Sequence, residues 1–276
     1  SLWVDDWNDM VKKTNALMFN KRFGLMDDET KNKLNNYEWS KNDNWIKNIE
    51  EIADGLTTID IAGGEPTLFP EQYKLYDMLI EKDCAKNIRL HLTSNLTNIP
   101  NKFLDYIKHF KKIIITASID GYDDINRYIR YPTAWSSVEK NLKKYCSYDN
   151  VSVRLACVVQ LYNIMHLYKL LDWIKNSRNI GIKFDVLLFT CIRSPTQLDI
   201  RILPEKLKDM AFDRLKPYIE DIDFSNRGTL LEKNKKDCAI KAIVDWMYSS
   251  DQSQKLNNFF AYTTAVDIQR NESLLN

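Results

Sequence analysis

The stretch TIDIAGGEP at residues 58–66 is the part of the chain that most constrains its fold. Its first residues are typical of a buried strand, and the rest would form the loop that leads to the next helix. Gly63 and Gly64 have no Cβ, so a ligand can approach their backbone closely. Pro66 ends the strand and stiffens the loop. The Glu65 carboxylate, beside exposed backbone carbonyls, suits a cationic group such as an amine.

Four more runs of strand length follow the first strand, which we expect at residues 58–62. Each run is short and rich in Ile, Val, Leu or Thr, as buried parallel strands are. The runs lie at residues 88–93, 112–118, 151–159 and 182–189. Helical patterns separate them, and this alternation requires right-handed crossovers and a mostly parallel sheet. The sequence therefore predicts an α/β fold.

Helical periodicity between the strands predicts where several helices begin. Pro70 suits the first turn of a helix that has Tyr73, Tyr76, Leu79 and Ile80 on one face. Ser136 and Glu139 are typical of a capping box that opens a later helix. We expect further helices over residues 163–175, 204–218, 229–248 and 254–270.

The two ends of the chain differ from its alternating middle. Residues 1–53 have helical patterns with polar connections, and the patterns after residue 220 are also helical. We therefore expect a helical N-terminal segment at 1–53, a core at 54–220 and a C-terminal helical extension at 221–276.

Composition excludes several classes of function. The 276 residues carry a net charge of +1, so no global field draws the protein to nucleic acid or to an anionic membrane. No apolar stretch has membrane-spanning length. The five cysteines (Cys84, Cys146, Cys157, Cys191 and Cys238) are scattered without a C-x-x-C pair, so their spacing predicts neither a zinc site nor a disulfide framework. We expect reduced thiols and a cytoplasmic location.

Polar or small residues follow every predicted strand. In a parallel α/β sheet, functional groups gather at the carboxyl ends of the strands. After residues 63–66, the later strand ends carry Thr93-Ser94-Asn95, Ser118-Ile119-Asp120-Gly121, Gln160 and Thr190, with Arg127 and Arg130 beyond the third strand. We expect these groups to meet at one rim.

In this order and spacing, the motifs resemble those of radical S-adenosylmethionine (radical SAM) enzymes over roughly residues 55–205. The match is closest to phage- and marine-type members described as twitch-domain radical SAM proteins. They share the Ser-Ile-Asp-Gly segment and an Arg-Tyr-Pro stretch, here at 130–132, followed by Trp135. The resemblance implies a partial (β/α) barrel of radical SAM type with its first strand missing and with helical extensions at both ends.

The resemblance also implies ligand contacts for S-adenosylmethionine. Backbone oxygens of Gly63 and Gly64 and the carboxylate of Glu65, in the loop that Pro66 closes, would hold the methionyl amino group. Arg130 would pair with the methionyl carboxylate, since bidentate geometry favours arginine.

The remaining implied contacts are to the nucleoside. Ser118, with Asp120 near it, would reach the ribose or the carboxylate end. Gln160 would contact the ribose, and the backbone near Leu188 would flank the adenine. Ser94 and Asn95 would line the opening of the same site. Two structural alternatives stay open, because Asp120-Gly121 is a common turn pair and Gln160 can equally satisfy a backbone group at its strand end. The pattern assigns no catalytic residue and no metal ligand, and the isolated histidines His91, His109 and His166 are expected to be structural or exposed.

In the family a 4Fe-4S cluster donates one electron to the sulfonium, and the resulting 5′-deoxyadenosyl radical abstracts hydrogen from a substrate. The C-x-x-x-C-x-x-C segment that holds this cluster is missing, since residues 1–57 contain no cysteine. Either the chain is an N-terminal truncation, which the analogy favours, or it is a natural cluster-less relative. In both cases these residues should not assemble the usual cluster, because thiolate ligands are required.

A missing first strand would leave the edge of the strand at 58–62 unpaired. We therefore expect the chain to form a homodimer there or to cover the edge with its N-terminal helices. For function, the favoured hypothesis is a radical SAM enzyme core with unknown substrate. The competing hypothesis is a non-catalytic protein that binds an adenosyl nucleotide or another metabolite. A TIM-type hydrolase or aldolase lacks support, because no strand end supplies a paired acid and base or a Schiff-base lysine.

Overall fold

The computed structural model describes residues 29, 32, 44–221, 224 and 239–274. The chain divides into two compact units, one of residues 46–253 and one of residues 1–45 together with 254–276. The sheet and the candidate site lie in the first unit. The helix α12 (Leu256–Arg270) belongs to the second unit. The expected boundaries at residues 53 and 220 stay predictions.

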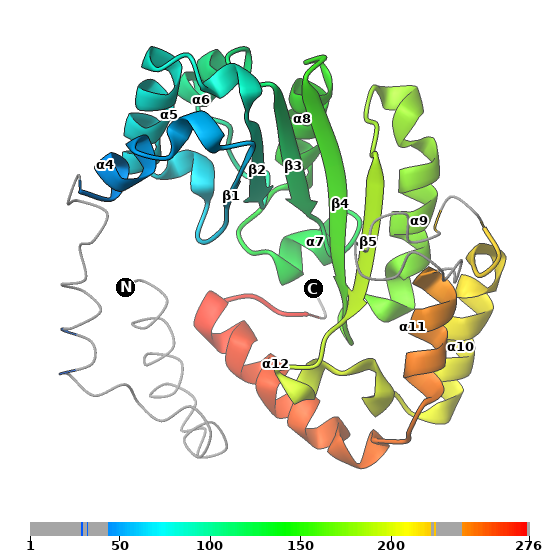
Figure 1. Cartoon of the computed structure of the whole chain (residues 1–276). Coiled ribbons are helices and arrows are strands. Elements are labelled where there is room, and N and C mark those ends of the chain that lie inside the picture. The colour runs from blue at the N-terminus through cyan, green and yellow to red at the C-terminus, as the bar shows by residue number, and fades with distance from the viewer. Residues whose placement is uncertain (1–28, 30–31, 33–43, 222–223, 225–238, 275–276) are drawn as a thin grey trace. The chain divides into compact units, whose positions relative to one another are not determined.

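The described residues of the first unit form one five-stranded parallel sheet in the order β1-β2-β3-β4-β5. Its strands are β1 (Thr58–Ile61), β2 (Arg89–Ser94), β3 (Lys112–Ser118), β4 (Val151–Val159) and β5 (Val186–Cys191). Sequential order in a parallel sheet requires each connection to cross over in the same sense. The sheet curves into a partial (β/α) barrel (Figure 1), which confirms the predicted α/β fold class.

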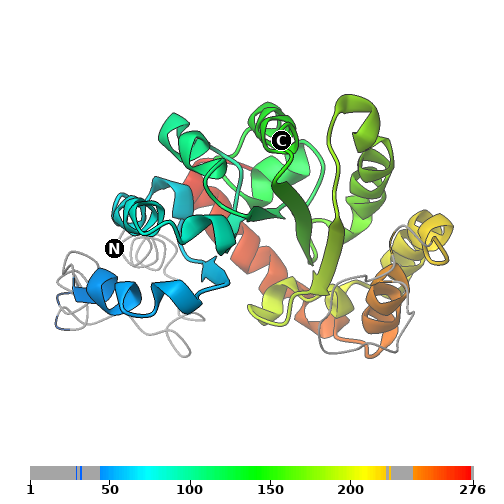
Figure 2. The same cartoon turned by 45° about the horizontal axis from the view of Figure 1, so that its top comes forward.

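Helices follow the strands as the alternating pattern predicts. In the first unit they are α5 (Glu71–Glu81), α6 (Asn101–Ile107), α7 (Asp124–Ile129), α8 (Trp135–Cys146), α9 (Leu167–Asn176), α10 (Glu205–Leu215) and α11 (Ala239–Tyr248). A short helix α4 (Asn44–Glu50) precedes β1. Figure 2 shows α5, α6, α8 and α9 along the convex side of the sheet. None of the helices in the described part of the chain has the length and apolar character to cross a membrane.

Two details of the sequence prediction are wrong. α8 begins at Trp135 after the extended residue Ala134, so Ser136 lies inside the helix and makes no capping bond. Glu139 instead accepts a hydrogen bond from Trp173 Nε1 at 2.8 Å and so joins α8 to α9. β5 begins later than predicted because Gly181 (φ 81°) ends a 3-10 turn and residues 182–185 only lead into the strand.

The two faces of the sheet differ in chemistry. The face toward the helices carries fully buried apolar side chains such as Leu90, Leu92, Ile113, Ile115 and Leu155. We call the opposite, concave face the inner face. It carries Asp60, His91, Thr116, Ser118, Arg154, Ala156 and Leu188, all half-buried or exposed. Because the helices α5, α6, α8 and α9 pack against the convex side of the sheet, its inner face is the side that a ligand can use.

Between the sheet and the helices lies a buried aromatic cluster around Tyr76. Its ring centroid lies 5.3 Å from that of Phe110 and 6.5 Å from that of Phe103. The Tyr76 hydroxyl is buried and has no hydrogen-bond partner among the described residues. Burial raises the pKa of Tyr76 far above its ordinary value. Its ring stabilises the core, whereas its hydroxyl does not.

We therefore predict that Tyr76→Phe raises the free energy of unfolding by about 1 kcal/mol, because it removes a buried polar group that has lost its water. Leu92→Ala is the control and should lower it by about 2–5 kcal/mol through loss of packing. Urea denaturation followed by circular dichroism measures both. A Tyr76→Phe variant less stable than the parent would show that the hydroxyl has a partner.

Candidate functional site

The carboxyl ends of the five strands share one edge of the sheet, because all the strands run in parallel (Figure 1). Gly63, Gly64 and Glu65 follow β1, and Asn95 follows β2. Asp120 follows β3, and Gln160 follows β4. The predicted strand-end groups therefore stand on one rim of the partial barrel.

The loop after β1 has the backbone that its glycines permit. Gly63 has φ 111° and Gly64 has φ 52°, which are values that residues with a Cβ rarely adopt. Both residues are exposed. The half-buried Glu65 carboxylate accepts a hydrogen bond from the backbone N–H of Asn95 at 2.9 Å and one from the Thr67 hydroxyl at 3.4 Å. Glu65 is thereby held between the first two loops of the rim.

Ser94, Asn95 and Pro66 shape these loops. The Ser94 hydroxyl is buried and accepts a bond from the Leu96 N–H at 3.0 Å. The Asn95 side-chain oxygen accepts one from the Thr97 N–H at 2.9 Å. Pro66 is buried in the 3-10 turn Pro66–Leu68. Their described contacts are with the protein's own backbone, as is common for Ser and Asn in turns.

The third strand-end loop contains a buried ion pair. Arg130 Nη2 lies 2.8 Å from Asp120 Oδ2, and the Asp120 side chain is 5% exposed. The other oxygen, Oδ1, accepts a bond from the Val158 N–H at 2.7 Å. Burial raises the pKa of the Asp120 carboxyl, while Arg130 and the Val158 N–H oppose that shift. In this structure Asp120 orients Arg130, a role that the sequence pattern does not indicate.

Arg130 still has an unused donor. Its Nε is buried and has no hydrogen-bond partner among the described residues. A buried donor left unpaired costs about 1–3 kcal/mol, which an anionic ligand at the rim would offset. The arginine is thus fixed by one carboxylate, and 25% of its side-chain surface stays exposed.

A chain of contacts connects the two halves of the rim. Glu65 binds the N–H of Asn95, and the neighbouring Thr97 hydroxyl lies 3.1 Å from the Thr133 hydroxyl. The Thr133 N–H donates to the carbonyl of Arg130 at 3.0 Å. The loop of Glu65 and the loop of Arg130 are therefore joined through the loop after β2.

Asn163, which the sequence places just beyond Gln160 after the fourth strand, is a structural residue of this rim. It is fully buried. Its Oδ1 accepts a bond from the Gln160 N–H at 2.8 Å, and its Nδ2 donates to the carbonyls of Asp120 and Val158 at 2.6 and 2.8 Å. The Gln160 side chain is itself buried. An asparagine four residues after the end of β4 is the signal that could have identified it.

Ser118 and Leu188 lie in one row of the inner face. Ser118 pairs in register with Ala156, and Ala156 pairs with Leu188. In a parallel sheet, paired residues point to the same side, so the predicted ribose and adenine contacts share a face.

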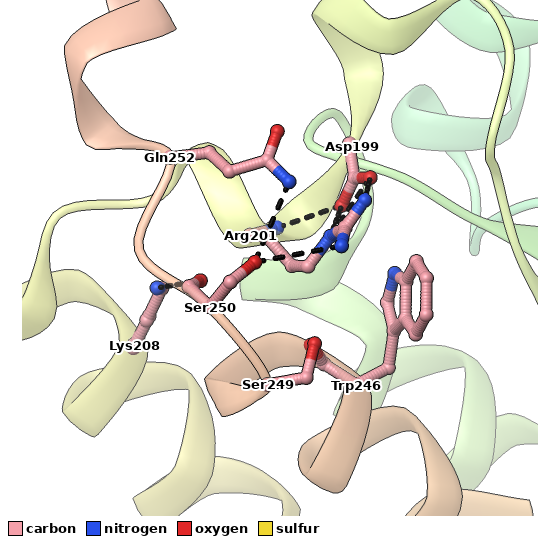
Figure 3. Close-up of polar contacts among 7 residues, drawn as sticks. All are labelled: Asp199, Arg201, Lys208, Trp246, Ser249, Ser250 and Gln252. Atoms are coloured by element: carbon pink, nitrogen blue, oxygen red, sulfur yellow. Dashed lines mark hydrogen bonds and ion pairs between the residues drawn. The ribbon is translucent and has the colours of Figure 1, made fainter.

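A second polar cluster lies beyond β5 (Figure 3). Arg201 binds the buried carboxylate of Asp199 through Nε and Nη2, the latter at 2.7 Å, and its guanidinium lies 4.0 Å from the ring centroid of Trp246. Lys208 donates to the carbonyl of Ser250 at 3.4 Å. The charge of Arg201 is neutralised here, so this cluster fastens α11 to the chain after β5 and offers no open site.

The described residues do not fit an iron–sulfur cluster. Cys84, Cys146, Cys157 and Cys191 are free. Burial raises the thiol pKa of Cys157, and that of Cys191 to about 12, which opposes the thiolate form that ligates iron. Within the described ranges, no group of three or more His, Cys, Asp or Glu side chains could hold a metal ion.

Comparison with known proteins identifies the family. The model described as Radical SAM superfamily matches residues 19–174, which is more than half of the chain. The chain belongs to the radical SAM superfamily. No curated protein matches it.

Two solved structures of SuiB from Streptococcus suis are similar to the chain, one bound to S-adenosylmethionine and one bound to the precursor peptide SuiA. Both are 17% identical to it over 64% of its length, with TM-scores of 0.42 and 0.43. The match covers 41% and 39% of those chains, so this chain spans about two fifths of their length.

We predict that Asn163→Ala lowers the free energy of unfolding by about 3 kcal/mol, because it leaves two buried backbone groups and one partly buried backbone group unpaired. Asn176→Ala is the matched control. Asn176 is exposed and donates to the carbonyl of Asp172 at 2.8 Å, so its loss should cost about 0.5 kcal/mol or less. Chemical denaturation of both variants measures the difference, and equal stabilities would refute the structural role of Asn163.

Proposed function

We propose that the chain is the S-adenosylmethionine-binding core of a radical SAM enzyme that acts on an unidentified substrate. The observation that carries the proposal is the continuous contact path from Glu65 to Arg130 along one rim. It couples an acceptor for an ammonium group to a donor for a carboxylate. An amino acid moiety carries both groups, as the methionyl end of this cofactor does.

The proposed contacts follow from these positions. The carbonyls of Gly63 and Gly64 and the carboxylate of Glu65 bind the amino group, and the exposed part of the Arg130 guanidinium binds the carboxylate. Asp120 holds the arginine in place. Ser118 and the backbone near Leu188, in one row of the inner face, accommodate the ribose and the adenine. Gln160 borders the same end of the sheet.

In the family, the bound cofactor supplies a 5′-deoxyadenosyl radical when a 4Fe-4S cluster reduces it. The 276 residues contain no C-x-x-x-C-x-x-C segment, so we propose that the cluster ligands of the parent enzyme lie outside them. The absence of such a thiolate group favours a second candidate, a cluster-less protein that binds an adenosyl nucleotide without radical chemistry. The coding DNA upstream of Ser1 separates the two. An open frame with three suitably spaced cysteines supports the enzyme, and a start codon with a ribosome-binding site supports the binding protein.

The cofactor site predicts weak S-adenosylmethionine binding even without a cluster. We expect Glu65→Ala and Arg130→Ala each to raise the dissociation constant about tenfold or more, since each removes a charge-assisted bond worth about 1.5–3 kcal/mol. Isothermal titration calorimetry measures the affinities. Arg127→Ala is the control, because Arg127 lies near Arg130 but is directed to Asp124 on its own helix.

Folding must be checked for Arg130→Ala, which leaves the buried Asp120 without its partner. The double variant Arg130→Ala with Asp120→Asn removes that unpaired charge, and we expect its affinity for S-adenosylmethionine to be as far below that of the parent as the affinity of Arg130→Ala is. No binding by the parent chain, or equal binding by the parent and the Glu65 and Arg130 variants, would reject the site.

The partners of the chain follow from its edges and charge. β1 is an outermost strand of the described sheet, and the N-terminal residues expected to cover it lie largely outside the described residues. We propose that either these residues or a second copy of the chain covers the edge, and that the protein works in the cytoplasm without nucleic acid or membrane partners.

If a second copy pairs at this edge, size-exclusion chromatography with light scattering will give twice the chain mass. A proline at Thr58, whose N–H points away from β2, will reduce it to the monomer. Backbone N–H groups are what strand pairing needs, and proline removes one. A monomer whose β1 amides exchange rapidly with deuterium would contradict both kinds of cover.

A further inference from the structure

A row of polar side chains crosses the inner face below the proposed cofactor site. Asp60 on β1 pairs in register with His91 on β2, and its Oδ1 lies 2.6 Å from His91 Nδ1. His91 Nε2 lies 2.9 Å from the Thr116 hydroxyl on β3. Three consecutive strands are thus linked through their side chains.

These contacts determine which atoms in the row donate hydrogen bonds and which accept them. The Asp60 carboxylate can only accept, so it selects the ring form in which His91 Nδ1 carries the proton. In the neutral ring Nε2 is then an acceptor, and the Thr116 hydroxyl donates to it. The three side chains form a polar row with a defined hydrogen-bond direction on the inner face.

Arg154 on β4 continues this row but has no counter-ion. It pairs in register with Thr116 on one side and with Val186 on the other. It forms no ion pair or hydrogen bond with any residue that the structure describes, and its Nε is buried. Arg130 and Arg201, by contrast, are each bound to a buried carboxylate. A half-buried guanidinium without an anion is unfavourable for folding, so its presence points to a ligand.

The position of Arg154 relates it to the cofactor. The row Thr116, Arg154 and Val186 lies two residues, about 6.6 Å, from the row Ser118, Ala156 and Leu188. Ala156 is the next residue on the same side of β4, and its small side chain leaves room beside the guanidinium. An anion bound to Arg154 would lie one step farther into the barrel than the proposed nucleoside.

We propose that Arg154, on the inner face, binds an oxyanion group of the substrate, either a carboxylate or a phosphate. The planar guanidinium matches both groups with two parallel bonds. The fixed Asp60–His91–Thr116 chain borders this group and presents polar side chains to the rest of the substrate. That the ligand is a substrate rests on the proposed function, whereas the anion site itself rests on Arg154 alone.

The test is anion binding by the parent chain and by Arg154→Gln and Arg154→Lys. The melting temperature is measured against increasing inorganic phosphate and, separately, acetate, with chloride keeping the ionic strength constant. We expect one of the two anions to stabilise the parent, with a dissociation constant at least tenfold higher in Arg154→Gln and an intermediate value in Arg154→Lys. Preference for phosphate or for acetate identifies the group. Arg127→Gln, which changes a half-buried arginine that is paired with Asp124 on its own helix, should behave as the parent does.

A second measurement separates a ligand site from a structural arginine. In chloride alone, Arg154→Gln should melt about 2 °C or more above the parent, because it removes an unpaired charge. A structural arginine would give the opposite shift. No stabilisation of the parent by either anion, or equal stabilisation of Arg154→Gln, would overturn the proposal.

The same variant distinguishes this proposal from the proposed function. Arg154→Gln should bind S-adenosylmethionine within twofold of the parent, since Arg154 lies outside the methionyl contacts. If the parent binds an anion through Arg154 but not the cofactor, the proposed function fails and the anion site remains. If it binds the cofactor through Glu65 and Arg130 but no anion, only the anion site fails.

Discussion

The buried ion pair between Asp120 and Arg130 is the interaction on which the candidate site depends. Asp120 follows β3, receives the N–H of Val158 on β4, and holds a guanidinium that comes from the end of α7. Three elements therefore meet at one carboxylate. A buried pair of this kind adds little net stability, and removing one partner is strongly destabilising. Its value is geometric, because it presents the free side of Arg130 at a defined place.

The two faces of the sheet have different roles, one in stability and one in the proposed function. Its convex face is closed by helices over fully buried aliphatic side chains, which supply the folding energy. Its concave face keeps groups that do not help folding, among them the unpaired Arg154 and the Asp60–His91–Thr116 chain. Functional sites commonly lower stability in this way. Because the strands are parallel and in register, Arg154 on the inner face lies two residues before Ala156, in the row next to the rim.

The sequence predicts the fold well because the strands are short and rich in aliphatic residues, and because the glycines after the first strand, Gly63 and Gly64, have the backbone that a turn there requires. The local sequence pattern does not predict a side chain's role where that role depends on a partner far away in the sequence. Glu139 does not cap its helix but accepts a hydrogen bond from Trp173, and Asp120 forms an ion pair with Arg130. The sequence pattern assigns no role to Asn163 or to Arg154 for a related reason. Their importance lies in what surrounds them across the sheet, which spacing along the chain does not encode.

The central claim is that separate strand ends converge on one amino acid moiety of an adenosylated ligand. A crystal structure of the chain soaked with S-adenosylmethionine tests it most directly. The account predicts electron density for the ammonium group against the Gly63 and Gly64 carbonyls and Glu65, with the carboxylate on Arg130 and the adenine near Leu188. Ligand density elsewhere, or on this rim with Arg130 turned away from the carboxylate, would contradict it.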